Sequence, residues 1–178
     1  MTPPPLVGRA RAAAARTGRE GCRDEVGTLL HVLAGRRGVE RVAEIGTGAG
    51  VGTAWLVSAL RPGVPLFTAE IDQELAKAAA ELFADDPDVH VLEGDWRVAL
   101  AEHAPFDLIF VDGGRAQNDP DAVLGLAVAG STVVIAGLGD EESEPDIRRE
   151  RWLSHPRVAV AEIGTGAGSH ALVATVRP

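Results

Sequence analysis

The feature that most constrains the fold is an apolar run, FDLIFV, at residues 106–111. A strand covered on both faces must be apolar at almost every position, whereas a half-exposed strand alternates. Similar short runs recur along the chain and are separated by segments with helical periodicity. We expect strands at 41–45, 65–70, 89–92, 106–111, 131–136, 157–163 and 169–176, and helices at 22–34, 50–60, 72–82, 95–102, 119–128 and 147–153. This alternation predicts an α/β fold with a mostly parallel sheet and helices on both faces.

The nonapeptide VAEIGTGAG occurs twice, at 42–50 and at 160–168. The first copy follows a strand and runs into a helix, so its glycines would turn the backbone and leave bare amides for a ligand. The second copy follows an alternating segment and precedes a strand-like one, which predicts a β-hairpin whose glycines serve the turn. We therefore favour one ligand loop and one turn over a duplicated site.

Length, net charge and cysteine count exclude several classes of protein. A length of 178 residues suits one domain with a single core. The net charge of −9 argues against a protein that tracks nucleic-acid phosphates, which normally carries a basic face. No apolar run is long enough to span a bilayer. Cys22 is the single cysteine, which excludes an intrachain disulfide and favours a reducing compartment such as the cytoplasm.

Acidic residues stand at the carboxyl ends of four consecutive expected strands. Glu44 lies two positions before the glycine loop, and Glu70 ends the second strand, where a carboxylate could accept both hydroxyls of a ribose. Asp95 follows the third strand and Asp112 follows the fourth. Open α/β sheets bind ligands at this edge. The loop itself reads G-x-G-x-G rather than G-x-G-x-x-G, which disfavours a nicotinamide-dependent dehydrogenase.

Four ordered motifs, VAEIGTGAGVGTAWLVSAL, LFTAEID, EGDW and FDLIFVDGG, resemble those of class I S-adenosylmethionine-dependent methyltransferases. More narrowly, they are similar to the small O-methyltransferases of the catechol and caffeoyl-CoA type and their bacterial relatives. The resemblance covers roughly Asp24 to the C-terminus. It implies a Rossmann-like fold with a seven-stranded sheet ending in an antiparallel strand pair, which agrees with the expected hairpin. Residues 1–178 would form one methyltransferase domain, with 1–36 as an N-terminal helical arm.

The resemblance also implies a binding site for S-adenosylmethionine, with S-adenosylhomocysteine as the product. The loop would hold the methionine part, Glu70 the ribose, and Asp95 with Trp96 the adenine slot, although Trp96 is equally compatible with a core position. The cofactor-binding residues that we expect are Glu44, Gly46, Thr47, Gly48, Gly50, Glu70, Ile71, Asp95, Trp96 and Asp112.

The chain departs from the family where a metal would bind. The metal-dependent relatives place Mg²⁺ between an Asp after strand four and an Asp-Asn pair after strand five, and oxygen ligands suit that hard cation. Asp112 stands at the first position, but Gly137, Leu138 and Gly139 follow strand five, and the next carboxylate is Asp140. We therefore predict no family-type metal site.

The expected catalytic residues are Asp112, Arg115 and Asp140. Arg115 stands where the family often has Lys or His, and an arginine that stays protonated is a poor general base. It could clamp a carboxylate or phosphate of the substrate, or form an ion pair with Asp112. Either Asp112 or Asp140 could act as the base.

The chain is compatible with two hypotheses about function. The first is metal-free methylation of a small-molecule acceptor, at oxygen, in the cytoplasm, without nucleic-acid or membrane partners. The alternative is a protein that binds S-adenosylmethionine or S-adenosylhomocysteine without methylating, with a regulatory role or different chemistry. The short N-terminal arm and the tight hairpin loop leave few walls for an acceptor, so a homodimer that completes the site is a further expectation.

Overall fold

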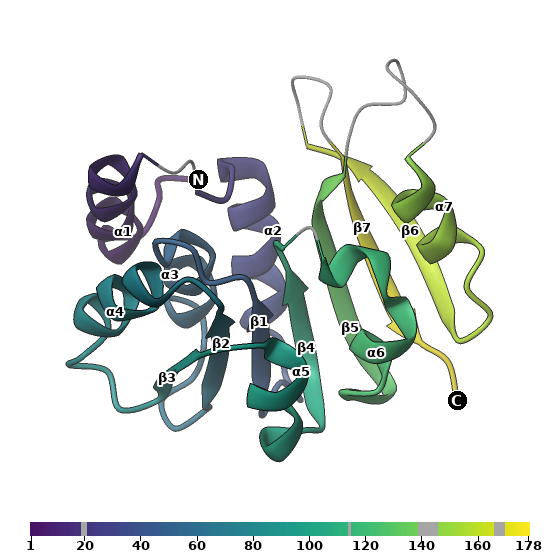
Figure 1. Ribbon diagram of the computed structural model, residues 1–178. Coiled ribbons are helices and arrows are strands. Elements are labelled where there is room, and N and C mark those ends of the chain that lie inside the picture. Colours follow the sequence, from purple (N-terminus) through teal and green to yellow (C-terminus); the bar gives the residue numbers. More distant parts are fainter. Residues whose placement is uncertain (19–20, 114, 139–145, 166–169) are drawn as a thin grey trace.

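The computed structural model describes residues 1–18, 21–113, 115–138, 146–165 and 170–178. Its centre is a seven-stranded sheet with the strand order β3-β2-β1-β4-β5-β7-β6 (Figure 1). The strands are β1 (Val42–Ile45), β2 (Leu66–Glu70), β3 (Val89–Glu93), β4 (Phe106–Val111), β5 (Ala127–Leu138), β6 (Val158–Gly164) and β7 (His170–Val176). Strands β1 to β5 are parallel, and β7 is antiparallel to β5 and β6. The expected Rossmann-like sheet and its C-terminal antiparallel hairpin are confirmed.

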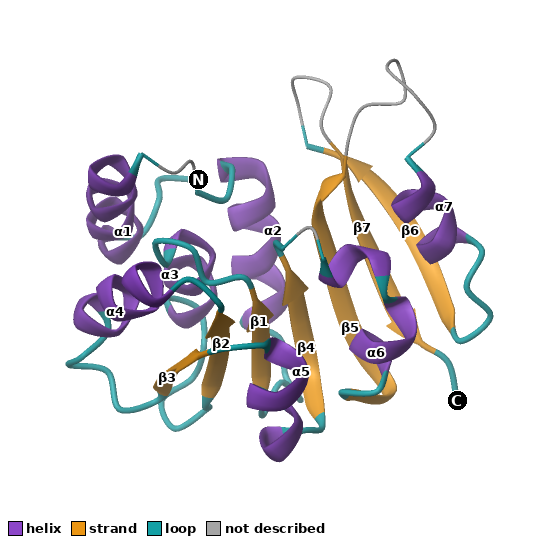
Figure 2. Cartoon of the chain, viewed as in Figure 1, coloured by secondary structure: helices purple, strands orange, loops and turns teal. Residues whose placement is uncertain are grey.

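Helices cover both faces of the sheet, as the apolar strands require (Figure 2). They are α1 (Pro5–Thr17), α2 (Asp24–Ala34), α3 (Val51–Val57), α4 (Gln73–Leu82), α5 (Trp96–Ala99), α6 (Pro120–Leu124) and α7 (Ile147–Leu153), with 3₁₀ turns η1 (Ala101–His103) and η2 (Ala116–Asn118). Buried side chains of α5, α6 and α7 pack on one face, and those of α2 and α3 pack on the other. Helix α1 packs against α3 and α4. Within the described ranges no helix is long and apolar enough to cross a membrane.

Strand β1 pairs with β2 on one side and with β4 on the other, so the order in which successive strands are added changes side at β1. Helix α3 follows β1 and packs on one face, whereas α6 follows β4 and packs on the opposite face. The loops after β1 and β4 therefore diverge to opposite faces and leave a crevice between them. This topology places the carboxyl ends of β1, β2 and β4 around one opening.

One expected helix is wrong at its C-terminal end. The periodicity predicts a helix over 119–128, but α6 ends at Leu124 and β5 already begins at Ala127. Ala127 lies beside Phe106 in the ladder between β4 and β5. The apolar residues of this segment fit helical and strand periods equally well, and only the pairing with β4 decides between them.

The two nonapeptides lie in different structures. The first forms β1 and the glycine loop that leads into α3, as expected. The second ends β6, which pairs with β7 so that Gly164 lies opposite His170. The expected hairpin strands are thus confirmed, while the turn at 166–169 lies outside the described residues.

Candidate cofactor and acceptor site

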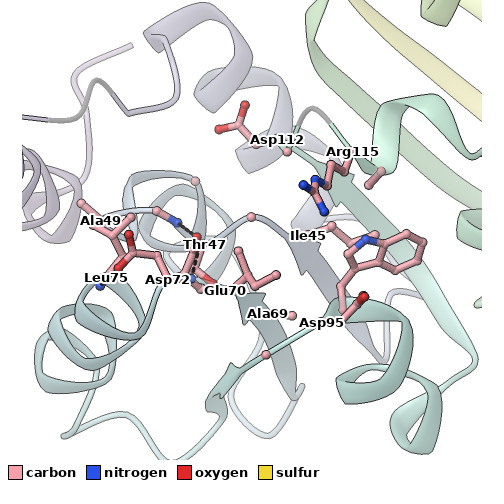
Figure 3. Close-up of a pocket in the computed structure, with 18 of the residues that line it drawn as sticks. Ile45, Thr47, Ala49, Ala69, Glu70, Asp72, Leu75, Asp95, Asp112 and Arg115 are labelled. Atoms are coloured by element: carbon pink, nitrogen blue, oxygen red, sulfur yellow. Dashed lines mark hydrogen bonds between the residues drawn. The ribbon is translucent and has the colours of Figure 1, made fainter.

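A cavity of about 540 Å³ lies at the carboxyl ends of β1, β2 and β4 (Figure 3). Its walls come from the glycine loop, the ends of β2 and β4, the start of α5 and the segment before α2. The lining residues are Gly21, Cys22, Ile45, Gly46, Thr47, Gly48, Ala49, Val51, Gly52, Ala69, Glu70, Ile71, Asp72, Leu75, Gly94, Asp95, Trp96, Arg97, Asp112, Gly113, Arg115 and Ala116. The cavity therefore gathers eight of the ten expected cofactor residues, all except Glu44 and Gly50.

Two glycines shape the loop. Gly46 has φ +93°, and a Cβ there would lie 3.2 Å from the backbone nitrogen of Gly113. A side chain would therefore push apart the loops that follow β1 and β4. Gly48 has φ +52°, and a Cβ there would meet no atom within 4 Å. Its bare backbone borders open space, which suits close approach by a ligand.

Glu70 is held in place by two backbone amides. The amide of Gly48 donates to Oε2 at 2.8 Å, and the amide of Asp72 donates to Oε1 at 3.0 Å. The side chain of Asp72 caps α4 by accepting from the amides of Glu74 and Leu75, as expected. A carboxylate can accept about four hydrogen bonds, so Glu70 keeps acceptor capacity for two ribose hydroxyls. Glu70 is thus linked to the glycine loop before any ligand binds.

Glu44 lies beneath the loop and does not line the cavity. Its carboxyl group, 1 % exposed, accepts hydrogen bonds from the hydroxyls of Thr53 and Thr68. The Thr68 hydroxyl lies 2.6 Å from that of Thr47, which does face the cavity. Burial raises the pKa of Glu44 to about 8, so the group is protonated at neutral pH. The motif resemblance implies a direct contact between Glu44 and the cofactor, whereas the structure connects Glu44 to the site through threonines.

Sequence reasoning missed Thr53 and Thr68 as functional candidates, and it included Thr47 only as part of the glycine loop. Threonines in apolar segments match ordinary strand and helix composition, so nothing in the motifs singled out Thr53 and Thr68. The one available signal was Glu44 itself, because a carboxyl group inside a buried strand needs hydrogen-bond donors nearby.

Gly50 also lies outside the cavity wall. It is the residue before α3, with φ +83°, and a Cβ there would lie 2.7 Å from the Phe83 ring. Its glycine character therefore permits the start of α3 to pack against the end of α4. This is a packing role within the loop.

The adenine side of the expected site contains Ile71, Asp95 and Trp96. Asp95 caps α5 by accepting from the amide of Arg97 at 2.9 Å. Trp96 is buried yet lines the cavity, with the Arg97 guanidinium 4.6 Å above its ring centre. Ile71, which is 71 % exposed, places an apolar side chain at the cavity. Together they offer apolar surface beside an acceptor, which suits a purine.

Asp112 and Arg115 lie on the side of the cavity that follows β4. The Asp112 side chain is exposed to the cavity, and the surrounding protein raises its pKa to about 6 by partial burial. Water in the open cavity opposes this shift, and a ligand that displaces the water would strengthen it. Burial, together with the charge of Asp112, also raises the pKa of the Cys22 thiol. Cys22 is therefore a protonated, unreactive wall residue at neutral pH.

The ion pair with Asp112, one of the two roles that the sequence leaves open for Arg115, is not formed. The two side chains point in different directions, and Arg115 has no ion pair with any residue that the structure describes (Figure 3). The third expected catalytic residue, Asp140, lies outside the described residues.

The described residues do not supply the donor set of a family-type Mg²⁺ site. A Cβ at Gly137 would lie 4.0 Å from Oδ1 of Asp112 and 3.2 Å from Nε2 of Gln117, so this position faces Asp112 without offering a ligand. Leu138 is buried and apolar. Among the described side chains no group of three or more His, Cys, Asp or Glu residues could hold a metal ion.

The second nonapeptide contributes nothing to the cavity within its described residues. Its acid, Glu162, forms an ion pair with Arg149 and lies 3.4 Å from Nδ1 of His170. These contacts tie α7 to the hairpin. The described part of this copy therefore has a structural role, as the flanking residues predicted.

The fold and the cavity define a class I S-adenosylmethionine-dependent methyltransferase. Residues 43–135 match the profile of a methyltransferase domain, and the chain belongs to this family. A Mycobacterium tuberculosis protein with an O-methyltransferase name is 32 % identical over 154 residues, which cover 80 % of this chain and 68 % of that protein. A Mycobacterium ulcerans relative with the same kind of name is 32 % identical over 133 residues, which cover 69 % of this chain and 59 % of that protein.

Solved structures of other proteins have the same overall fold. The O-methyltransferase TomG from Streptomyces achromogenes, involved in tomaymycin synthesis and solved with S-adenosylmethionine, has a TM-score of 0.82 and 27 % identity, covering 98 % of this chain and 91 % of that one. The cofactor-bound protein Rv0187 from MTB has a TM-score of 0.85 and 25 % identity, covering 98 % of this chain and 90 % of that one. The resemblance to O-methyltransferases inferred from the four motifs is thereby confirmed.

Proposed function

We propose that this chain transfers a methyl group from S-adenosylmethionine to a hydroxyl oxygen of a small molecule. The observation that carries the proposal is Glu70, fixed by the amides of Gly48 and Asp72 at the edge of a cavity where the fold binds ligands. The cofactor supplies an activated methyl group on its sulfonium. The protein has to align the acceptor with that methyl group and accept the proton that the acceptor's hydroxyl loses.

The residues present fit the cofactor. The loop residues Gly46, Thr47 and Gly48 would hold its methionine part, and Glu70 would accept hydrogen bonds from its ribose hydroxyls. Ile71, Asp95 and Trp96 would hold its adenine. Glu44 and Gly50 act indirectly, because the first supports Thr47 through Thr68 and the second allows α3 to start against Phe83.

Asp112 is the base that we propose for the acceptor hydroxyl. It lines the cavity next to Gly113 and Arg115, and its raised pKa makes it a better proton acceptor than an ordinary carboxylate. Asp140 remains the alternative base from the sequence. We propose a transfer without a metal, because among the described residues Gly137, which faces Asp112, has no side chain to act as a second ligand.

The pH dependence of methyl transfer tests this assignment. Because the ionised form of Asp112 accepts the proton, kcat/KM should rise with pH and level off above about 6. Asp112→Asn should lower kcat by roughly a hundredfold or more and remove this step from the profile. A step that survives in Asp112→Asn but disappears in Asp140→Asn would assign the base to Asp140 instead.

Cofactor binding is tested by calorimetric titration of S-adenosylmethionine and S-adenosylhomocysteine, with and without Mg²⁺. Glu70→Ala should weaken binding about tenfold or more, because it removes the ribose acceptor and frees the Gly48 amide. Glu162→Ala, which removes the equivalent charge far from the cavity, should bind like the wild type. Equal affinity for the wild type and Glu70→Ala would contradict the assigned ribose site. Binding without methyl transfer to any acceptor would favour the non-methylating alternative.

Location and assembly belong to the same proposal. A single half-buried cysteine and a net charge of −9 support a small-molecule enzyme of the cytoplasm rather than a nucleic-acid partner. We propose a homodimer because the short N-terminal arm leaves few walls for the acceptor, and a second subunit would complete the site. Sedimentation of a monomer at working concentration would remove the dimer from the proposal.

A further inference from the structure

We propose that the acceptor is an acidic small molecule whose carboxylate or phosphate group binds Arg115 while its hydroxyl faces Asp112. The inference rests on the proposed methyl transfer and names the substrate class for that site. It starts from the charges of the cavity wall. The described wall contains two arginines, Arg97 and Arg115, and they differ in whether their charge is already neutralised.

Arg97 is committed to the protein. Its guanidinium lies 2.9 Å from Oδ2 of Asp119, 3.7 Å from Oδ1 of Asp95 and above the ring of Trp96. Arg115 has none of these contacts within the described residues, and its side chain points into the cavity (Figure 3). A guanidinium without a protein anion, at a ligand cavity, is ready to form a bidentate pair with a carboxylate or phosphate.

The 3₁₀ turn that follows Arg115 is held by hydrogen bonds to two other elements. Arg115 precedes η2, in which Ala116 and Gln117 are buried. The Gln117 side chain donates to the carbonyl of Ala136 in β5 and accepts from Nη1 of Arg148 in α7 at 2.7 Å. The Gln117 carbonyl accepts from the indole of Trp152 at 3.0 Å. Two elements therefore fix the turn, so that less ordering of the backbone is needed when a ligand binds.

The region beside Asp112 explains why the acceptor needs such an anchor. Here Gly137 occupies the facing position, and the amide of Gln117 lies next to it. Among the described residues of this wall, Arg115 supplies a fixed positive charge that can orient the acceptor. The anionic group of the substrate takes over the orienting role.

The pair of charges sets the selectivity. Asp112 and Arg115 line one cavity and point in different directions, so that a hydroxyl and an anionic group on the same acceptor can each reach one of them (Figure 3). A neutral acceptor would leave the guanidinium without a counter-charge and would lack an anchor. We therefore expect discrimination between an acid and its neutral amide, carried by Arg115.

The test compares 3,4-dihydroxybenzoate with 3,4-dihydroxybenzamide, which has nearly the same shape and no charge. Binding to the S-adenosylhomocysteine-saturated protein is measured by calorimetry, and methyl transfer is measured for both compounds and for 4-hydroxyphenyl phosphate. The wild type should prefer the acids. Arg115→Met should raise the Kd and KM of the acids about 10- to 100-fold, with little change in kcat and none for the amide. Arg115→Lys should recover part of the preference, and Arg37→Met, a surface variant with the same change of net charge, should keep it.

Two kinds of failure can be distinguished. If S-adenosylhomocysteine does not bind, or no acceptor of any charge is methylated, the proposed function itself fails. If the cofactor binds but neither acid binds or reacts better than the amide, the inference about the acceptor is overturned. It is also overturned if Arg115→Met affects acid and amide equally, since Arg115 would then support the cavity without reading charge. If the wild type prefers only one of the two acids over the amide and Arg115→Met abolishes that preference, the inference holds for that anionic group.

Discussion

Glu44 and Glu162 occupy the same position in two identical nonapeptides, yet the pKa values of their carboxyl groups shift in opposite directions. Burial raises the pKa of Glu44 to about 8, whereas hydrogen bonding to Arg149 lowers the pKa of Glu162. The neighbouring apolar residues differ as well, because Ile45 is 2 % exposed and Ile163 is 38 % exposed. In its described residues, the same string therefore forms a buried strand and a glycine loop before α3 at one place, and the end of an edge strand at the other.

The difference arises from the residues on the C-terminal side of each copy. After the first copy, α3 begins at Val51, so Thr53 in its first turn can donate to Glu44 and the chain crosses over the sheet. After the second copy, His170 begins β7, which returns alongside β6. The same string thus occurs in two different structural contexts. The flanking periodicity and the tertiary neighbours decide the role.

The largest difference between the copies should appear when each acid is removed. Glu44→Ala should lower the free energy of unfolding by about 2–3 kcal/mol, because it leaves the buried hydroxyls of Thr53 and Thr68 without their acceptor. It should also weaken cofactor binding, since Thr47 loses its support. Glu162→Ala should cost less than about 1 kcal/mol, as expected for a partly exposed ion pair. Urea denaturation of both variants measures the contrast, and equal losses would contradict the different roles.

A matched pair of glycine substitutions should give a somewhat smaller effect. Gly46→Ala forces a side chain into φ +93° and against the backbone of Gly113, at a cost of about 1–3 kcal/mol. Gly164 is the corresponding residue of the second copy, and a Cβ there would meet no atom within 4 Å. Gly164→Ala should therefore change stability by about 0.5 kcal/mol or less. Thermal unfolding with and without S-adenosylhomocysteine compares the two, and a ligand-induced stabilisation that survives in Gly46→Ala would argue against the close loop contact.

The smallest expected effect is a difference in the pH dependence of stability. Glu44 holds a proton in the folded state that the unfolded chain releases, so its contribution falls as pH rises from its ordinary pKa of 4.5 to about 8. Glu162 has a lowered pKa, so its contribution is present above 4.5 and is lost as pH falls below that value. Glu44→Gln should remove the first slope and Glu162→Gln the second. Denaturation series across both pH ranges measure the slopes, and a slope that is unchanged in the corresponding variant would contradict the assigned protonation state.

Much of the fold could be predicted because its strands are buried on both faces. FDLIFV identified β4, and the motifs at the end of each strand located the cavity edge through Glu70, Asp95 and Asp112. The start of β5 at Ala127 was not predictable, since its apolar residues fit either period and the pairing with Phe106 is a long-range contact. The links from Glu44 through Thr68 to Thr47 were missed for the same reason, because residues 24 and 21 positions apart meet only in the folded sheet.

The central claim is that the first nonapeptide holds the cofactor and the second does not. Amide chemical shifts of the isotopically labelled protein during titration with S-adenosylhomocysteine test it most directly. We predict large shifts at Gly46, Gly48, Ile71 and Trp96, with no change at Gly164 and Thr165. Shifts at Gly164 and Thr165 comparable to those at Gly46 and Gly48, or unchanged Gly46 and Gly48 amides in the saturated protein, would contradict the account.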